Sequence, residues 1–460
     1  MRLWLQNVEV AGQRADVEVA RGRVVALHPA GGRVPVEAEH VVDGAGGALL
    51  PGLHDHHMHL LALAAMRSSV DCAPAADLAA LGDLLRADRH PDGWIRAVGY
   101  DEERIGRLDR RVLDALVGER PVRVQHRSGA LWVLNSSALQ QVEAVLGADS
   151  DVELDAEGRP NGRLWRYDSR LSAVLPRRVP DLAALGRELR SLGLTGVTDA
   201  TPDLDPQALE LLRGAVATGE MALEVTVLAQ GARPEEVAPL RVGPAKLLLA
   251  DHDLPSVPWL SARIRSHHGA GRPVAVHCVT AESLVLTLAA LEEAGVLAGD
   301  RIEHASVVPF GLEPELARLG LRVVTQPGFL STRGERYRAE VEPSDLPMLY
   351  PVARLLAAGV PTVCSSDAPF GVLDPWQVIA AARDRRTEAG LVLGESERVG
   401  PEVALSGYLA PPADPGGEVR RVAPGERADL LLLAGPLAAA LATPDRGWVR
   451  TTFRNGQPFA

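Results

Sequence analysis

The stretch LLPGLHDHHMHL, residues 49–60, is the most informative part of the sequence, since four of the thirteen histidines lie between His54 and His59. Alternate residues of a β-strand point to the same side. His57 and His59 are therefore predicted to bind one cation at the C-terminal end of a strand, whereas His54 and His56 are not required as ligands. Imidazole nitrogen binds zinc, nickel and iron well, so a His-x-His pair after Pro-Gly favours a metal site over a merely hydrogen-bonded pair.

Outward from this stretch, β-rich runs alternate with helical segments, which is typical of parallel strands in an α/β fold. Ten such runs can be identified, two more than an eight-stranded barrel needs. From Thr195 onward the runs recur at the spacing of β-strand–helix units, but a long segment separates Leu60 from Gly193. The runs WIRAVGY (94–100) and VRVQHRS (122–128) fall in that segment, and we assign them to an insertion after the first barrel strand.

Both ends of the chain alternate apolar and polar residues, as half-buried antiparallel strands do. Asn455-Gly456 predicts a hairpin in the C-terminal part. Because chain ends often lie close together, the two ends are predicted to form one domain. The predicted fold is thus α/β with three parts: a small β-sandwich domain, a (β/α)8 TIM-like barrel and an insertion subdomain for substrate recognition or closure, spanning residues 1–48 plus 405–460, 49–66 plus 188–404, and 67–187, respectively.

Composition excludes several other classes of protein. Hydrophobic residues make up 46% and charged residues 23%, as in globular proteins. The formal net charge of −12 argues against nucleic acid or an anionic membrane as the main partner. The chain starts without the apolar segment of a signal peptide, and its longest nearly apolar run, Leu430 to Ala442, is too short to span a bilayer. We expect a cytoplasmic protein with a small-molecule partner.

The three cysteines Cys72, Cys278 and Cys364 are far apart, which predicts no disulfide framework and fits a reducing compartment. Cys278 and Cys364 are expected to be small core residues rather than nucleophiles. This leaves other side chains to carry the chemistry.

Further residues that can bind a metal lie in the later β-rich runs. Lys246 lies in AKLLLAD, His277 in VAVHC, His304 in RIEHAS and Asp367 in PTVCSSD. Each alone has an ordinary explanation, such as a core histidine or a helix cap. Barrel active sites are built at the C-terminal ends of the strands, so these residues together with the histidine pair favour one shared site.

Several motifs resemble those of a known family. PGLHDHHMH resembles the Pro-Gly-x-x-Asp-x-His-x-His signature of the amidohydrolase superfamily, and RIEHAS, SSDAPF and GERADLLLLAG are similar to other parts of its pattern. The chain most resembles amidohydrolase family 3, a branch that includes N-substituted formamide deformylases. GYDEER and SGALWVLNSSAL resemble pieces of the large insertion that this branch carries after its first strand.

The resemblance implies a metal-dependent (β/α)8 hydrolase with six metal ligands: His57, His59, Lys246, His277, His304 and Asp367. One or two divalent ions are implied, zinc being the expected metal. The histidine pair of the first strand holds the more buried ion, and His277 with His304 holds the second. Lys246, carboxylated by CO2, bridges the two ions, because a carbamate is an anionic oxygen ligand and an ammonium is not. If Lys246 is an ordinary lysine, the site holds one metal.

The resemblance also implies a reaction. Metal-bound hydroxide attacks the carbonyl of an amide, formamide or cyclic amide, while Asp367 acts as general base and then as general acid toward the leaving amine. Two alternatives stay open: a mononuclear deaminase or esterase of the same superfamily, and a non-catalytic amidohydrolase-like binding protein. Homo-oligomers are expected only because they are common in the superfamily.

The sequence departs from the family pattern in three places. Ala130 replaces a histidine, Arg166 replaces a glutamate, and Asp251-His252 replaces Asp-Gly. His126 and His252 are candidate replacements for the lost histidine. The first two departures lie in the insertion and keep the binding-protein alternative open.

Arg166 reverses the charge that the family has at its position. Its planar guanidinium matches a carboxylate or phosphate, so Arg166, with Arg127 or Arg163, is predicted to favour a substrate that carries an anionic group. A surface arginine in a diverged loop is the simpler alternative.

Overall fold

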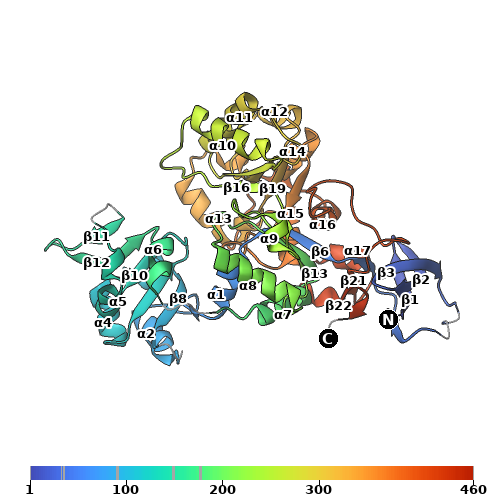
Figure 1. Ribbon diagram of the computed structural model, residues 1–460, viewed down its shortest axis with the longest axis horizontal. Coiled ribbons are helices and arrows are strands. Elements are labelled where there is room, and N and C mark those ends of the chain that lie inside the picture. Colours follow the sequence, from blue (N-terminus) through green and yellow to red (C-terminus); the bar gives the residue numbers. More distant parts are fainter. Residues whose placement is uncertain are drawn as a thin grey trace. The chain divides into compact units, whose positions relative to one another are not determined.

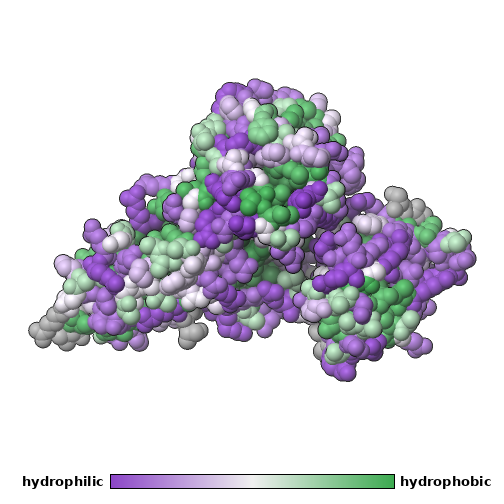
Figure 2. Space-filling view, turned by 180° about the vertical axis from the view of Figure 1, so that it is seen from behind, coloured by the Kyte–Doolittle hydropathy of each residue, from purple (hydrophilic) through white to green (hydrophobic). Residues whose placement is uncertain are grey.

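The computed structural model describes residues 2–32, 34, 37–89, 93–147, 151–175 and 179–458. The chain forms two compact units. Unit 1 comprises Met1–Leu60 and Leu182–Ala460, and unit 2 comprises Leu61–Asp181. Among the described residues, no helix combines the length and the apolar character needed to cross a membrane. In the space-filling view, polar residues cover most of the visible face, with smaller hydrophobic patches between them (Figure 2).

Unit 1 carries its parallel strands where the sequence analysis expects barrel strands. They are β6 (Leu53–Met58), β13 (Leu194–Asp199), β14 (Glu224–Val227), β16 (Ala245–Leu247), β17 (Val274–Cys278), β18 (Arg301–His304), β19 (Arg322–Thr325) and β20 (Thr362–Cys364). Two sheets contain them, in the orders β15-β14-β13-β6 and β16-β17-β18-β19-β20, where β15 is Arg241–Val242. All pairs in both sheets are parallel. This is a TIM-barrel-like α/β arrangement.

Backbone hydrogen bonds connect the two sheets on both sides. Asp367 N donates to His57 O over 2.8 Å, and His59 N donates to Ala368 O over 2.8 Å, which joins the end of β6 to the segment after β20. On the other side, Lys246 N donates to Leu228 O over 2.9 Å, which joins β16 to the end of β14. The C-terminal ends of β6 and β20 are therefore held side by side.

Helices connect successive strands. In unit 1 they are α7 (Leu182–Ser191), α8 (Pro206–Ala217), α9 (Pro234–Val237), α10 (Val257–Gly269), α11 (Ala281–Ala294), α12 (Glu313–Arg318), α13 (Phe329–Glu340), α14 (Val352–Ala357), α15 (Pro375–Asp384), α16 (Pro401–Leu409) and α17 (Leu437–Ala442). Local sequence explains several starts. Asp205 caps α8, Ser256 caps α10 and Thr280 caps α11, each by accepting a backbone N–H of the first turn.

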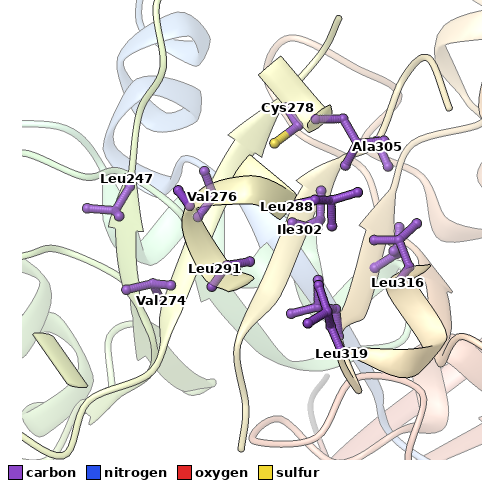
Figure 3. Close-up of a cluster of buried hydrophobic side chains, with 14 of the residues drawn as sticks. Leu247, Val274, Val276, Cys278, Leu288, Leu291, Ile302, Ala305, Leu316 and Leu319 are labelled. Atoms are coloured by element: carbon purple, nitrogen blue, oxygen red, sulfur yellow. The ribbon is translucent and has the colours of Figure 1, made fainter. Parts of the chain in front are cut away.

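A cluster of buried apolar side chains lies between strands β16–β19 and helices α10, α11, α12 and α14, which are grouped beside these strands in Figure 1. Figure 3 shows Leu288 and Leu291 of α11 among Val276 of β17 and Ile302 of β18. Cys278 lies in this cluster, and Cys364 is buried in β20, so the prediction that both are core residues is confirmed. Burial raises the pKa of each thiol to about 12, which keeps both protonated.

The two chain ends build two further sheets of unit 1. One has the order β3-β2-β1-β4 and the other β23-β22-β21-β5; their strands are β1 (Arg2–Val10), β2 (Gln13–Ala20), β3 (Arg23–Pro29), β4 (His40–Asp43), β5 (Leu49–Pro51), β21 (Leu430–Leu433), β22 (Val449–Arg454) and β23 (Gln457–Pro458). Side chains from both ends share one apolar core. The predicted hairpin is confirmed: Asn455 and Gly456 have φ of 49° and 78° and connect β22 to β23.

The run that the sequence analysis treats as the first barrel strand divides at Gly52. Leu49–Pro51 pairs with β21 in an end sheet, whereas Leu53–Met58 pairs with β13. A Cβ at Gly52 would lie 2.2 Å from the side chain of Thr195, so glycine permits the close approach where the chain passes from one sheet to the next.

Unit 2 contains a sheet of its own, in the order β11-β12-β10-β9-β8-β7. Its elements are α1 (Leu60–Arg67), β7 (Val70–Asp71), α2 (Leu78–Ala87), β8 (Ile95–Tyr100), α3 (Glu102–Ile105), α4 (Arg110–Val117), β9 (Val122–His126), β10 (Leu131–Leu134), α5 (Ser136–Gln141), β11 (Val152–Leu154), β12 (Pro160–Trp165) and α6 (Asp168–Val174). The runs 94–100 and 122–128 therefore provide β8 and β9 of this sheet. Its apolar cores are separate from those of unit 1.

Candidate metal centre

Three of the predicted ligands meet where β6 and β20 end. His57 Nε2 lies 3.4 Å from Asp367 Oδ1, and His59 Nε2 lies 3.2 Å from the same oxygen. One ligand atom from each of the three residues fits within a group whose members are all within 4.8 Å of one another. His57 is fully buried, whereas the His59 side chain is 17% exposed. Two imidazoles and a carboxylate are a donor set suited to a divalent transition metal.

The other predicted ligands adjoin this group. The ring centroids of His57 and His304 are 4.7 Å apart, and those of His304 and His277 are 4.4 Å apart. Lys246 is almost fully buried. Burial first, and then the charge of Lys246, lowers the pKa of His57 well below its usual range and that of His277 to about 3. These imidazoles are neutral near pH 7, which is the form that binds metals.

Lys246 itself has an unusual environment. Burial lowers the pKa of its ammonium to about 8, although the carboxylates of Glu303 and Asp367 act in the opposite direction. Its side chain points to no hydrogen-bond acceptor in the described part of the chain. A buried lysine without a partner differs from the usual surface lysine, whose head group stays in water.

Two of the candidate metal ligands have a left-handed backbone conformation. His304 has φ of 71° and Asp367 has φ of 53°, a region that residues other than glycine rarely adopt. Both lie at or just after the end of a strand, and both side chains lie near His57 of β6. Such strained conformations occur most often at functional sites.

Three buried polar atoms in this group lack hydrogen-bond partners within the described residues: His57 Nε2, Lys246 Nζ and Asp367 Oδ1. Buried polar atoms are nearly always paired, because an unpaired one loses its hydration without compensation. Here His57 Nε2 and Asp367 Oδ1 lie 3.4 Å apart, and neither has a hydrogen-bond partner among the described residues. The residues present therefore fit a bound cation.

A set of outer residues contacts the Nδ1 side of three of the candidate imidazoles, and the sequence analysis did not identify these residues. His57 Nδ1 donates to Glu303 Oε2, and Glu303 Oε1 accepts from Arg301 Nε over 2.5 Å. His59 Nδ1 is hydrogen-bonded to Thr201 Oγ1 over 3.0 Å, and His304 Nδ1 donates to Gln326 Oε1 over 2.8 Å. Each contact leaves the Nε2 atom for a metal. Thr201, Glu303 and Gln326 lie at or just after the C-terminal ends of β13, β18 and β19, so their position at strand ends is the signal that could have found them, whereas Arg301 begins β18.

The remaining residues of the signature have structural contacts. His54 Nε2 is hydrogen-bonded to Thr198 Oγ1 over 2.9 Å, and His56 Nε2 donates to Gly407 O over 3.1 Å, as expected for residues that are not ligands. Asp55 accepts from the backbone N–H groups of His57 (3.0 Å) and Ser366 (3.2 Å). Burial raises its pKa to about 7. Asp55 thus joins the two chain segments that carry His57 and Asp367.

The predicted substrate-binding arginines lie in unit 2 and are paired with carboxylates. Arg166 forms an ion pair with Asp151, and its backbone N–H donates to Ala130 O over 2.7 Å. Arg127 pairs with Asp101 over 2.8 Å. Arg163 is almost fully buried and binds two glutamates, Glu102 and Glu153, which assigns it a structural contact.

The two candidate replacement histidines lie in different units. His126 belongs to β9 of unit 2, where its Nδ1 is hydrogen-bonded to Ser128 Oγ over 2.9 Å. His252 is exposed in the turn between β16 and α10 of unit 1. Their roles toward a substrate stay predictions.

Comparison with known proteins identifies the class. Residues 40–460 match the model of the amidohydrolase family, so the chain belongs to this family. It is therefore a hydrolase that acts on carbon–nitrogen bonds, and its family implies a divalent metal.

Individual relatives agree with this class. N-substituted formamide deformylase of Arthrobacter pascens is 27% identical over 463 residues, which cover 85% of this chain and 84% of the relative. The crystal structure of an uncharacterized metal-dependent hydrolase from Pyrococcus horikoshii OT3 matches with a TM-score of 0.77 at 19% identity, covering 100% of both chains. N-isopropylammelide isopropylaminohydrolase from Burkholderia multivorans matches with a TM-score of 0.56 at 18% identity, covering 100% of this chain and 98% of that one. The structural matches support the TIM-barrel-like fold.

Proposed function

We propose that this chain hydrolyses the carbon–nitrogen bond of a formamide, amide or cyclic amide, with an N-substituted formamide as the first substrate to test. The observation that carries the proposal is that ligand atoms of His57, His59 and Asp367 lie close together. Two of these residues contribute buried atoms, His57 Nε2 and Asp367 Oδ1, that have no hydrogen-bond partner among the described residues. The relative that deformylates N-substituted formamides supports the choice of substrate class.

In this proposal one or two divalent ions, zinc first among them, are held by the predicted ligands: His57, His59, Lys246, His277, His304 and Asp367. A bound divalent ion supplies Lewis acidity, which polarises a carbonyl oxygen and lowers the pKa of water. We further propose that Lys246 is carboxylated, because its amine is buried, unpartnered and close to the histidines. A carbamate there would replace a cation by an anionic oxygen ligand.

Asp367 is the proposed general base and acid. Its Oδ1 faces the Nε2 atoms of His57 and His59, so the carboxylate is directed at the place where the ligands converge. It accepts the proton of the attacking water and passes a proton to the leaving nitrogen, which then departs as a neutral amine. No other acid is needed, because the proton that Asp367 takes from water is the proton that it gives to the leaving amine.

The finer architecture completes the proposal. The eight parallel strands close into a (β/α)8 barrel, the chain ends form a β-sandwich domain, and residues 67–187 form a substrate-recognition subdomain to which Arg166 and His126 belong. His252 is the candidate substrate contact that belongs to unit 1.

The test is metal content per chain by elemental analysis, on protein purified without chelator and with bicarbonate, followed by assays on N-alkyl formamides and their N-acetyl counterparts. About two divalent ions, falling in Lys246→Ala, together with formamide hydrolysis, would support the proposal. One ion that is indifferent to Lys246 would favour a mononuclear deaminase-like site. A chain that takes up no metal after reconstitution would contradict the proposal and favour the binding-protein alternative.

A further inference from the structure

The three imidazoles with known outer contacts are held by groups of different charge. His57 Nδ1 contacts a carboxylate, Glu303, whereas His59 and His304 contact a neutral hydroxyl and a neutral amide. A carboxylate partner makes an imidazole a stronger metal ligand, because the partly shared proton leaves more electron density on the far nitrogen. The difference between these contacts therefore predicts that His57 binds a metal more strongly than His59 or His304 does.

The Glu303 carboxylate is fixed from the other side. Arg301 and Glu303 are two residues apart on β18 and point to the same side of the strand. Arg301 Nε donates to Glu303 Oε1, and Arg301 Nη2 donates to His56 O over 3.3 Å. Both side chains are almost completely buried. Arg301 therefore fixes the position of the carboxylate, whose second oxygen faces His57.

Two other roles for Glu303 agree less well with these contacts. Glu303 is not placed as a metal ligand, because one oxygen is taken by Arg301 and the other by His57. A purely structural ion pair would need only Arg301, yet the carboxylate also binds the nitrogen of a histidine from β6. A buried ion pair is also weak evidence for stability alone, since desolvation offsets much of its attraction.

We propose that Glu303 is a positioning residue that acts through His57, and that the Arg301–Glu303 pair sets the affinity of the most tightly bound ion of the centre. The inference rests on the proposed function, since it takes His57 as a ligand. It adds an order of loading: the ion held by His57 binds first, and any second ion, held by His304 with its neutral partner, binds more weakly.

The experiment is a Co2+ titration of the metal-free full-length chain, followed by visible absorption and compared among wild type, Glu303→Gln and Glu397→Gln. Glu397 is the matched control: it is almost fully buried and accepts from Arg354 Nε over 2.7 Å, but it has no contact with a candidate ligand. In Glu303→Gln we expect the tightest step to weaken about 10- to 100-fold and its absorption band to shift. The control should leave both unchanged.

The outcomes separate the two proposals. Wild-type Co2+ binding with an unchanged tight step and band in Glu303→Gln would overturn the role of Glu303 and leave the metal centre in place. Equal weakening in both variants would also overturn it, because the effect would then belong to any buried ion pair. If wild type binds no Co2+, the proposed function fails first and this inference with it.

A second variant keeps the test informative if Glu303→Gln does not fold. Arg301→Lys keeps a cation beside Glu303 but loses the planar contact to its carboxylate. The proposal expects a smaller weakening of the same tight step and a shift of the same absorption band. An unchanged tight step in Arg301→Lys would contradict it.

Discussion

The strand ends of unit 1 and the arginine-rich strands of unit 2 both gather polar side chains, but they treat them in opposite ways. At the end of β6, His57 Nε2 is buried and has no protein partner in the described chain. In unit 2, Arg127, Arg163 and Arg166 each bind a carboxylate. The comparison teaches that charge alone does not mark a site. The candidate site stands out because unpaired buried atoms of several candidate ligands, His57, Lys246 and Asp367, lie close together there.

The largest expected effect comes from the carboxylate of the unpaired group. Asp367→Asn removes the proposed proton acceptor while keeping the shape of the side chain, and kcat is expected to fall by about 10²- to 10⁴-fold. The assay is formamide hydrolysis at saturating substrate. Asp16→Asn is the control, since Asp16 is a buried carboxylate that binds backbone N–H groups in the end sheet. An unchanged kcat in Asp367→Asn would contradict the role of Asp367 as general base and acid.

Metal removal tests whether the unpaired atoms bind an ion that stabilises the fold. A ligand that binds only the folded state stabilises it, by about 2.7 kcal/mol when its free concentration is 100 times Kd. Chelation is therefore expected to lower Tm, and added Zn2+ should restore it. His57→Ala should show the lower Tm with or without metal. Identical Tm values for wild type before and after chelation would mean that no bound ion stabilises the fold.

The paired arginines of unit 2 should affect stability rather than metal content. Arg163 is buried between Glu102 and Glu153, so Arg163→Met is expected to lower the free energy of unfolding by about 1–3 kcal/mol. The measurement is denaturant unfolding, with elemental analysis on the same sample. Loss of metal in Arg163→Met at unchanged stability would contradict this division of roles.

The smallest effect is expected at Arg166. Its side chain is 51% exposed and paired with Asp151, so Arg166→Ala should change the free energy of unfolding by less than about 1 kcal/mol. If Arg166 contacts an anionic group of the substrate, the variant lowers kcat/KM for an acidic substrate relative to its neutral analogue. A preference that stays the same would leave Arg166 as a surface arginine.

Much of the site could be predicted because its ligands follow strand ends that are visible in the sequence. His57, His304 and Asp367 each lie beside a turn after a β-rich run, and parallel strands bring such ends to one edge. The sequence analysis did not predict that β5 and β6 belong to different sheets. The stretch LLPGLHDHHM shows no local break, because it is continuously apolar or histidine-rich. The close contact of Gly52 with Thr195, where the chain changes sheet, joins residues far apart in the sequence. Glu303 could not be predicted from the sequence, because its contact with His57 joins residues 246 positions apart.

The sequence by itself determined which residue types stand at the ends of the strands, and hence the class of chemistry, because side-chain alternation and strand-helix spacing are local properties. Only the tertiary structure decided how those residues are used. It showed that His57 turns one nitrogen to Glu303 and leaves the other unpaired, and that Arg166 meets Asp151. Such pairings depend on distances between residues far apart in the chain, and no local pattern records them.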